Sequence, residues 1–217
     1  MSALVFDLDG TLVDSAPDMA EALNRVMAAR DLLGFALAEV RGFVGNGVAM
    51  LIRRAMAARG RAGEAVFADW HDAYLAAYAD CICVETRLYP GVAEVLDGLA
   101  GHRLAICTNK PQALTDALLE ALDLRPRFAA VLGGDTEFGR KPDPAPLRQV
   151  AGLIGTADAV MVGDSMADAG AARAAGLPLI LYTGGYRDRA VDEIAPDARF
   201  DHWDALPGLV PAMMERA

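Results

Sequence analysis

Two aspartates near the start of the chain interrupt a short apolar run, in the sequence Ala3-Leu4-Val5-Phe6-Asp7-Leu8-Asp9-Gly10. Side chains two positions apart on a strand point to the same side, so both carboxylates are expected to face one cavity where the strand ends. Two carboxylates this close repel each other unless a cation or a shared proton relieves them, and a divalent metal with oxygen ligands would do so. The alternative is an ordinary strand exit with solvated aspartates, but a buried strand makes solvation less easy.

A second acidic pair follows the apolar run 159–163. Asp164 ends that run, and Asp168 lies four residues later, one turn along the expected helix. Ser165 with Asp168 resembles an N-terminal capping arrangement, which leaves Asp164 without a structural explanation. Because Asp164 should lie beside Asp7 and Asp9, and no His or Cys joins them, the set suggests Mg²⁺ more than Zn²⁺.

Only two of the 20 basic residues are lysines, Lys110 and Lys141. Lys110 follows Thr108 and Asn109 at the end of the apolar run 103–108, just before a proline suited to a helix start. A hydroxyl at a helix N-terminus suits a phosphate, although a simple helix cap is equally consistent. Lys141 lies in a segment stiffened by prolines, so both lysines fall beside expected strand ends, where a compact ammonium could be required.

Composition narrows the class of protein. The chain has 217 residues, of which 54% are apolar and 23% charged, so it is long and apolar enough for a sizeable core. A net charge of −10 disfavours a nucleic-acid binder. No segment approaches the ~18 unbroken apolar residues of a membrane helix, and no signal peptide is recognisable, so we expect a cytoplasmic protein. Cys81, Cys83 and Cys107 are too few for a disulfide scaffold, and we interpret the C-x-C pair as small apolar side chains rather than a metal site.

The chemistry-bearing residues need a scaffold, and the apolar pattern predicts one. Apolar runs typical of strands buried on both faces begin at residue 3 and cover 103–108, 129–133, 159–163 and 178–182. Helical patterns cover 92–99, 113–122, 146–153 and 166–175. Strands alternating with helices indicate a parallel α/β sheet, whose ligands bind outside the carboxyl ends of the strands.

The interval from 15 to 88 breaks this alternation. It holds helical patterns at 16–30, 48–59 and 64–78 and no convincing strand, so we expect a helical module, 15–88, inserted into a core made of 1–14 and 89–217. Arg41, Gly45 and Asn46 belong to its most unusual stretch, where backbone N–H groups or the arginine could meet a small carboxylate. A glycine-capped turn and a solvated arginine are the alternatives. The acidic segment 194–204 and the closing helix 205–216 carry no chemical signal.

Four segments together resemble the haloacid dehalogenase superfamily of aspartate-based phosphohydrolases. FDLDGTLVDS, ICTNKP, GRKPDP and VGDSMADAGAARAAG match its four motifs in order. The resemblance implies a Rossmann-like, doubly wound parallel sheet core with an inserted small α-helical cap. Within the superfamily, VRGFVGNGV, TRLYPGV and YTGGY are most similar to phosphoglycolate phosphatases.

The resemblance also implies roles for individual residues. Asp7 corresponds to the nucleophile that forms a phosphoaspartate, and Asp9 to the general acid/base. Thr108 would hydrogen-bond a phosphoryl oxygen, and Lys141 would pair with the phosphoryl charge and with Asp7. From their own position at the end of the run 103–108, and not from the resemblance, Asn109 and Lys110 are further candidates for binding the substrate, Lys110 for its charged end.

The same resemblance implies a Mg²⁺ site. Asp164 would ligate the ion together with Asp7 and the backbone carbonyl of Asp9. Asp168 would orient Lys141 or a metal-bound water.

The expected activity is therefore Mg²⁺-dependent hydrolysis of a small phosphorylated metabolite, with 2-phosphoglycolate giving glycolate and phosphate as the leading reaction. Another sugar-phosphate phosphatase, a phosphomutase, a dehalogenase or a non-catalytic binding protein on the same fold are the alternatives. A monomer and a homodimer are both compatible with the sequence.

Overall fold

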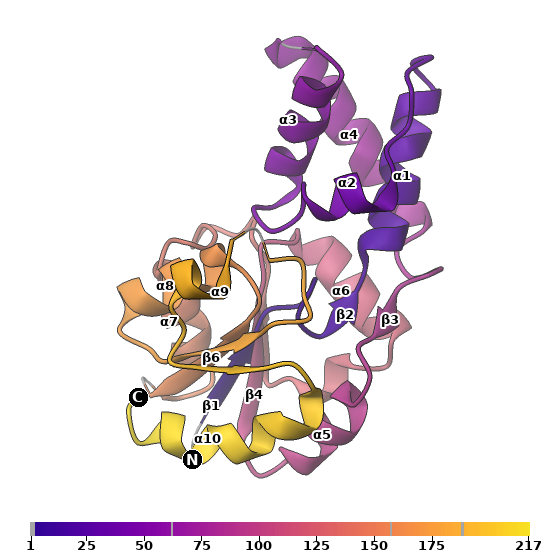
Figure 1. The fold of residues 1–217 in the computed structure, drawn as a ribbon. Coiled ribbons are helices and arrows are strands. Elements are labelled where there is room, and N and C mark those ends of the chain that lie inside the picture. The colour runs from indigo at the N-terminus through magenta and orange to yellow at the C-terminus, as the bar shows by residue number, and fades with distance from the viewer. Residues whose placement is uncertain (1–2, 62, 157, 188) are drawn as a thin grey trace.

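A six-stranded parallel sheet forms the centre of the molecule, in the order β5-β4-β1-β6-β7-β8 (Figure 1). The structure is a computed structural model and describes residues 3–61, 63–156, 158–187 and 189–217. The strands are β1 (Ala3–Phe6), β4 (Arg103–Cys107), β5 (Ala130–Leu132), β6 (Ala159–Gly163), β7 (Leu179–Tyr182) and β8 (Ala198–Phe200). Every neighbouring pair is parallel, so the predicted α/β class is confirmed.

Successive side chains of β1 pack on opposite faces of the sheet. Leu4 and Phe6 pack into one core, against α5 (Val92–Gly98), α6 (Gln112–Ala121) and α10 (Leu206–Met214). Ala3 and Val5 pack into the other, against α7 (Ala145–Leu153), α8 (Met166–Ala175) and α9 (Val191–Ile194). Two short 3-10 helices, Arg125–Arg127 and Trp203–Ala205, complete these layers. With helices on both faces, β1 is fully buried, which explains its unbroken apolar sequence.

The strand order places a binding crevice beside β1. Counted in chain order along this sheet, the strands lie 3-2-1-4-5-6, the doubly wound arrangement whose ligands bind where the order reverses. The reversal lies between β1 and β6, because the chain runs outward through β4 and β5 on one side and through β6, β7 and β8 on the other. Asp7 and Asp164 follow directly after these two strands.

A separate group of helices stands beyond the sheet (Figure 1). It consists of α1 (Ala16–Ala28), α2 (Leu37–Arg41), α3 (Val48–Ala58) and α4 (Glu64–Asp80), and we call residues 16–80 the four-helix segment. These helices share their own apolar core, which includes Leu23, Ile52 and Tyr74. The chain enters the four-helix segment after β2 (Val13–Asp14) and returns from it to β3 (Arg87–Leu88), and these two strands pair antiparallel.

The sequence analysis missed five α-helices and strands of the described structure, among them the four-residue helix α9. The two-residue strands β2 and β3 and the five-residue helix α2 are too short to produce a periodic pattern. β8 is the sixth strand, in a segment to which we assigned no role; its three residues lie at the sheet edge, with Arg199 exposed. Within the described residues, no helix is both long and apolar enough to span a membrane.

Candidate active site

The sharp exit from β1 brings Asp7 to the carboxyl edge of the sheet. The Asp7 N–H donates to the Val162 carbonyl at 2.9 Å, which keeps it in register with β6. Gly10 then turns the chain with φ +88°, and a Cβ at this position would lie 2.5 Å from Oδ2 of Asp164. Glycine is therefore required here both for its backbone conformation and for the close approach of a second carboxylate.

A buried lysine joins Asp7 to Asp168. Lys141 Nζ lies 2.8 Å from Oδ1 of Asp7 and 2.7 Å from Oδ1 of Asp168, and it donates to the Cys107 carbonyl at 2.5 Å. Burial by itself lowers the pKa of Lys141, but the Asp168 and Asp7 carboxylates outweigh it and raise the pKa. The lysine therefore remains charged, in contact with both carboxylates.

Asp7 itself is held in an environment unfavourable to its negative charge. Burial raises its pKa to about 6, with Asp168 adding to the rise and Lys141 opposing it. Apart from the ion pair with Lys141, its Oδ1 has no hydrogen-bond partner among the described residues. One carboxylate oxygen is thus buried and directed at a cation, without other partners to hold it.

Asp164 lies close to this pair. Its Oδ1 accepts a hydrogen bond from the Thr11 hydroxyl at 3.1 Å, and its Oδ2 accepts one from the Tyr186 N–H at 2.7 Å. Burial raises the pKa of Asp164, and the nearby charges of Asp168 and Asp7 raise it further. Oxygens of the three carboxylates lie within 4.8 Å of one another.

Asp168 is fixed from the start of α8. Its Oδ2 accepts hydrogen bonds from the Ser165 hydroxyl at 2.7 Å and the Ser165 N–H at 3.0 Å. This is the capping arrangement expected from the sequence. The same side chain therefore caps a helix with one oxygen and contacts Lys141 with the other.

The acidic cluster meets the requirements of a divalent cation site. Asp7, Asp164 and Asp168 are all buried, and only oxygen ligands are present, which suits Mg²⁺. Burial, with the neighbouring charge of Asp168, raises the pKa of Asp7 and of Asp164 and so disfavours their charged forms. A bound dication would supply the missing positive charge.

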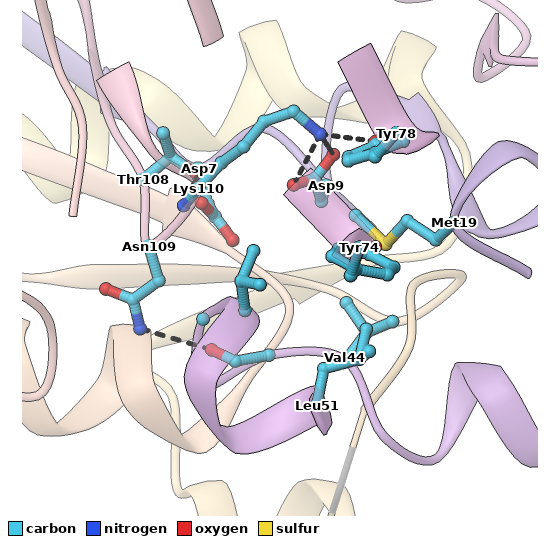
Figure 2. A pocket seen from close by; sticks show the side chains of 13 residues that line it. Asp7, Asp9, Met19, Val44, Leu51, Tyr74, Tyr78, Thr108, Asn109 and Lys110 are labelled. Carbon is cyan, nitrogen blue, oxygen red and sulfur yellow. Dashed lines mark hydrogen bonds and ion pairs between the residues drawn. The ribbon is translucent and has the colours of Figure 1, made fainter. Parts of the chain in front are cut away.

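Asp9 occupies a different position from the one expected for a third carboxylate beside Asp7 and Asp164. Its Oδ1 accepts hydrogen bonds from the Ser15 hydroxyl at 2.6 Å and from Lys110 Nζ at 3.1 Å. Lys110 Nζ also donates to the Tyr78 hydroxyl oxygen at 2.5 Å (Figure 2). Asp7 and Asp9 are thus each paired with one of the chain's two lysines, Asp7 with Lys141 and Asp9 with Lys110.

Thr108 and Asn109 continue β4 at the same edge. Thr108 is buried, and its N–H donates to the Leu132 carbonyl, extending the pairing with β5. The Asn109 side-chain amide donates to the Lys141 carbonyl at 2.9 Å and to the Gly45 carbonyl at 3.2 Å. Asn109 therefore links the Lys141 loop to the four-helix segment.

The three candidate residues of the four-helix segment, Arg41, Gly45 and Asn46, do not all lie at the cavity beside Asp7 and Asp9. Gly45 lines the central cavity. Arg41 is instead partly exposed and paired with Asp14 at 2.8 Å, and the Asn46 side-chain oxygen accepts a hydrogen bond from Arg54. Neither the Arg41 nor the Asn46 side chain is among the residues that line the cavity.

The cavity lies between the sheet edge and the four-helix segment (Figure 2). Thirteen residues line it: Asp7, Asp9, Met19, Val44, Gly45, Gly47, Val48, Leu51, Tyr74, Tyr78, Thr108, Asn109 and Lys110. Sequence reasoning missed Tyr74 and Tyr78, although their spacing of four on a helical pattern placed both on one face. Two phenols on one helix face were a signal, but the pattern did not say which face met the sheet.

This fold and this constellation of residues define a class of enzyme. The model of the haloacid dehalogenase-like hydrolases matches residues 1–176, and the chain belongs to that family. Hydrolases of this family generally use Mg²⁺, in agreement with the buried acidic cluster.

Individual relatives narrow the class to phosphatases. The chain is 42% identical over 217 residues to a phosphoglycolate phosphatase of Cereibacter sphaeroides, covering 99% of this chain and 100% of the relative. It is 45% identical to a phosphoglycolate phosphatase of Mesorhizobium japonicum, covering 94% and 92% of the two chains. The crystal structure of a predicted phosphoglycolate phosphatase from Haemophilus somnus superposes with a TM-score of 0.90 at 32% identity, covering 96% and 97%. The chain is therefore a phosphatase of this family, which confirms the predicted reaction class.

Proposed function

We propose that this phosphatase hydrolyses 2-phosphoglycolate to glycolate and phosphate through a phosphoaspartate intermediate on Asp7. The observation that carries the proposal is the contact of Lys141 with Asp7, beside Asp164, at the reversal point of the sheet. The names of the relatives in Cereibacter sphaeroides and Mesorhizobium japonicum support the choice of substrate. A structural relative, CbbY from Rhodobacter sphaeroides, was solved in complex with phosphate and superposes with a TM-score of 0.80 at 26% identity, covering 94% of this chain and 95% of that one.

In this mechanism, an Asp7 carboxylate oxygen attacks phosphorus and the ester oxygen leaves. Lys141 positions Asp7 and balances charge as two anions approach each other. Asp9 protonates the leaving oxygen of glycolate. Asp9 then accepts a proton from the water that attacks the phosphoaspartate, releasing phosphate and restoring the Asp7 carboxylate. Such acid/base assistance contributes about 10²–10⁴-fold to the rate.

The remaining groups bind and orient. Thr108 would hydrogen-bond a phosphoryl oxygen, with Asn109 holding the Lys141 loop beside it. Mg²⁺ would be held by Asp7, Asp164 and the backbone carbonyl of Asp9. When bound, it would neutralise phosphoryl charge and help to orient that group. Asp168 would act through Lys141, which it contacts.

We further propose that residues 15–88 form a cap domain on a core of residues 1–14 and 89–217. The apolar core shared by the four helices, which Leu114 of α6 also joins, supports this division, as does the passage of the chain into and out of the segment through the pair β2–β3. Because Val44, Leu51 and Tyr74 of this segment line the cavity, the cap would select the substrate while the sheet edge supplies the phosphoryl chemistry.

A panel of phosphate monoesters assayed for phosphate release, with Mg²⁺ and with a chelator, tests the proposal. We expect the highest kcat/KM for 2-phosphoglycolate and loss of turnover with the chelator. The Asp7→Asn variant should keep the wild-type circular dichroism spectrum and lose turnover, because an amide is not a competent nucleophile. A higher kcat/KM for a sugar phosphate would overturn the substrate, and normal turnover in folded Asp7→Asn would overturn the nucleophile. Halide release from haloacids, or phosphate transfer without release, would indicate a dehalogenase or a phosphomutase.

A further inference from the structure

The hydroxyl of Tyr74 is buried without a partner. Tyr74 has no exposed surface, and its hydroxyl makes no hydrogen bond within the described part of the chain. Buried hydroxyls are nearly always paired, because leaving one unpaired destabilises the fold. Tyr74 also lines the cavity that contains Asp7 and Asp9. A group that enters this cavity can therefore supply the missing partner.

A buried cation lies at the same cavity. Lys110 is 4% exposed, and its ammonium lies 4.3 Å from the centre of the Tyr78 ring as well as donating to the Tyr78 hydroxyl oxygen. Tyr78 is one helical turn from Tyr74, and their ring centres are 5.6 Å apart. The three N–H donors of the ammonium contact Oδ1 of Asp9 at 3.1 Å, Oδ2 of Asp9 at 3.4 Å and the Tyr78 hydroxyl oxygen, so an acceptor that enters the cavity would replace the long contact with Oδ2.

The other cap residues at the cavity are apolar or glycine, and the space is small. Met19, Val44, Val48 and Leu51 offer no polar side chains to the hydroxyls of a sugar. The cavity volume is about 40 Å³, which favours a small ligand over a large one. The available side-chain contacts therefore favour a short ligand that carries acceptors at its far end.

We infer that Tyr74 and Lys110 form a carboxylate subsite that selects phosphate monoesters bearing a second anionic group, with Tyr78 holding Lys110 in position. Both groups act as donors, and a carboxylate offers two acceptor oxygens. Burial raises the pKa of Tyr74, with Asp9 adding to the rise, so its hydroxyl stays protonated and able to donate. The inference rests on the proposed function and names the residues that would read the carboxylate of 2-phosphoglycolate.

Calorimetric titration of the full chain with Mg²⁺ tests this subsite. The Asp7→Asn background prevents turnover, and the two ligands are 2-phosphoglycolate and ethyl phosphate, which lacks the carboxylate. We expect the parent to bind 2-phosphoglycolate more tightly and Tyr74→Phe to lower that preference about tenfold, the typical loss for one hydrogen bond to a charged group. Lys110→Met should lower the preference as well. Tyr182→Phe is the matched control, because it changes a buried tyrosine in the core below the sheet and should leave the ratio unchanged.

The melting temperature separates recognition from folding. Removing an unpaired hydroxyl should leave the melting temperature of Tyr74→Phe equal to or above that of its parent. Equal affinity of the parent for the two ligands, or an unchanged ratio in Tyr74→Phe, would overturn the subsite. The titrations measure binding and do not depend on turnover. The proposed function fails independently if the wild type releases no phosphate from 2-phosphoglycolate.

Discussion

Lys141 is defined by its short contacts on three sides. The Asp7 and Asp168 carboxylates and the Cys107 carbonyl all lie within 2.8 Å of Nζ, and the side chain is 1% exposed. A compact ammonium satisfies all three acceptors, whereas a planar guanidinium needs more space. This explains why lysine is present here in a chain that otherwise uses arginine for nearly all its positive charge.

Lys141→Arg is therefore not a conservative change. We expect kcat for phosphate release to fall about 10²–10³-fold, the range for loss of one positioned donor, because the larger group must displace Asp7 or Asp168. Arg25→Lys, at an exposed pair on α1, is the control and should keep wild-type kcat. Wild-type kcat in Lys141→Arg would show that charge alone, without position, is sufficient.

Residue types and spacing located most of this site, but not its internal pairing. Alternation along β1 predicted that Asp7 and Asp9 would face one cavity, and both line it. Their carboxylates nevertheless lie with different lysines, since the turn at Gly10 brings Ser15 and α4 next to Asp9. The prediction for Arg41 failed for another reason. Its local sequence suggested that it binds a small carboxylate, but it pairs with Asp14, which belongs to a strand too short to predict.

At the scale of elements, close packing of β6 on α8 controls the position of Asp168. A Cβ added to Gly163 would lie 2.4 Å from Cγ of Asp168. Only glycine at this position allows the Asp168 side chain to reach both Ser165 and Lys141. The end of β6 thus contributes to the site in two ways: Gly163 leaves room for the Asp168 side chain, and Asp164 supplies a carboxylate.

Gly163→Ala should both destabilise the protein and lower kcat. We expect a loss of about 1–3 kcal/mol in the free energy of unfolding, typical of overpacking, with reduced phosphate release as Asp168 shifts. Gly152→Ala on α7 is the matched control, because nothing lies within 4 Å of its added Cβ and helical alanine is favoured. Denaturant unfolding and steady-state kinetics on both variants provide the measurement. An unchanged Gly163→Ala protein would contradict this account of the packing.

The junction between α1 and the return of the chain depends on one buried carboxylate. Asp18 accepts hydrogen bonds from the N–H groups of Val84, Glu85 and Thr86 and from the Thr86 hydroxyl. The sequence signalled nothing here, because a single aspartate in the first turn of a helix ordinarily interacts with its own helix. Its partners are 66–68 positions away, and only the tertiary fold brings them near.

Asp18→Ala should be strongly destabilising. Removing the carboxylate leaves several backbone donors unpaired, so we expect a loss of about 3–5 kcal/mol, comparable to breaking a buried charged contact. Asp80→Ala, exposed at the end of α4, is the control and should fall within about 0.5 kcal/mol of wild type. The denaturant midpoints of the two variants measure this difference in stability. Equal midpoints would mean that this junction contributes little to folding.

At the scale of the whole molecule, the reversal of strand order determines where like charges must gather. Because the direction of progression along the sheet changes between β1 and β6, Asp7 and Asp164 come together from distant parts of the sequence. The apolar runs predicted that these strands end at one edge of a parallel sheet, whereas the doubly wound order was implied by the family resemblance. The apolar pattern could not predict how the four-helix segment lies over that edge, because amphipathic helices indicate which face is buried and not what buries it.

We expect the gathered carboxylates to destabilise the metal-free fold, and this expectation can be tested with Asp164→Asn. Burial and the charges of Asp168 and Asp7 disfavour a charged Asp164, so Asp164→Asn should have a melting temperature in a chelator equal to or above that of wild type.

Adding Mg²⁺ should raise the melting temperature of the wild type. At 100 times its dissociation constant, a ligand specific for the folded state adds about 2.7 kcal/mol, which corresponds to roughly 5–10 °C for a chain of this size. Asp164→Asn should lose most of this rise, so the order of the two proteins reverses when Mg²⁺ is added. Thermal unfolding of both proteins, with Mg²⁺ and with a chelator, measures this directly. A similar Mg²⁺-induced rise in Asp164→Asn would show that the ion does not depend on this carboxylate.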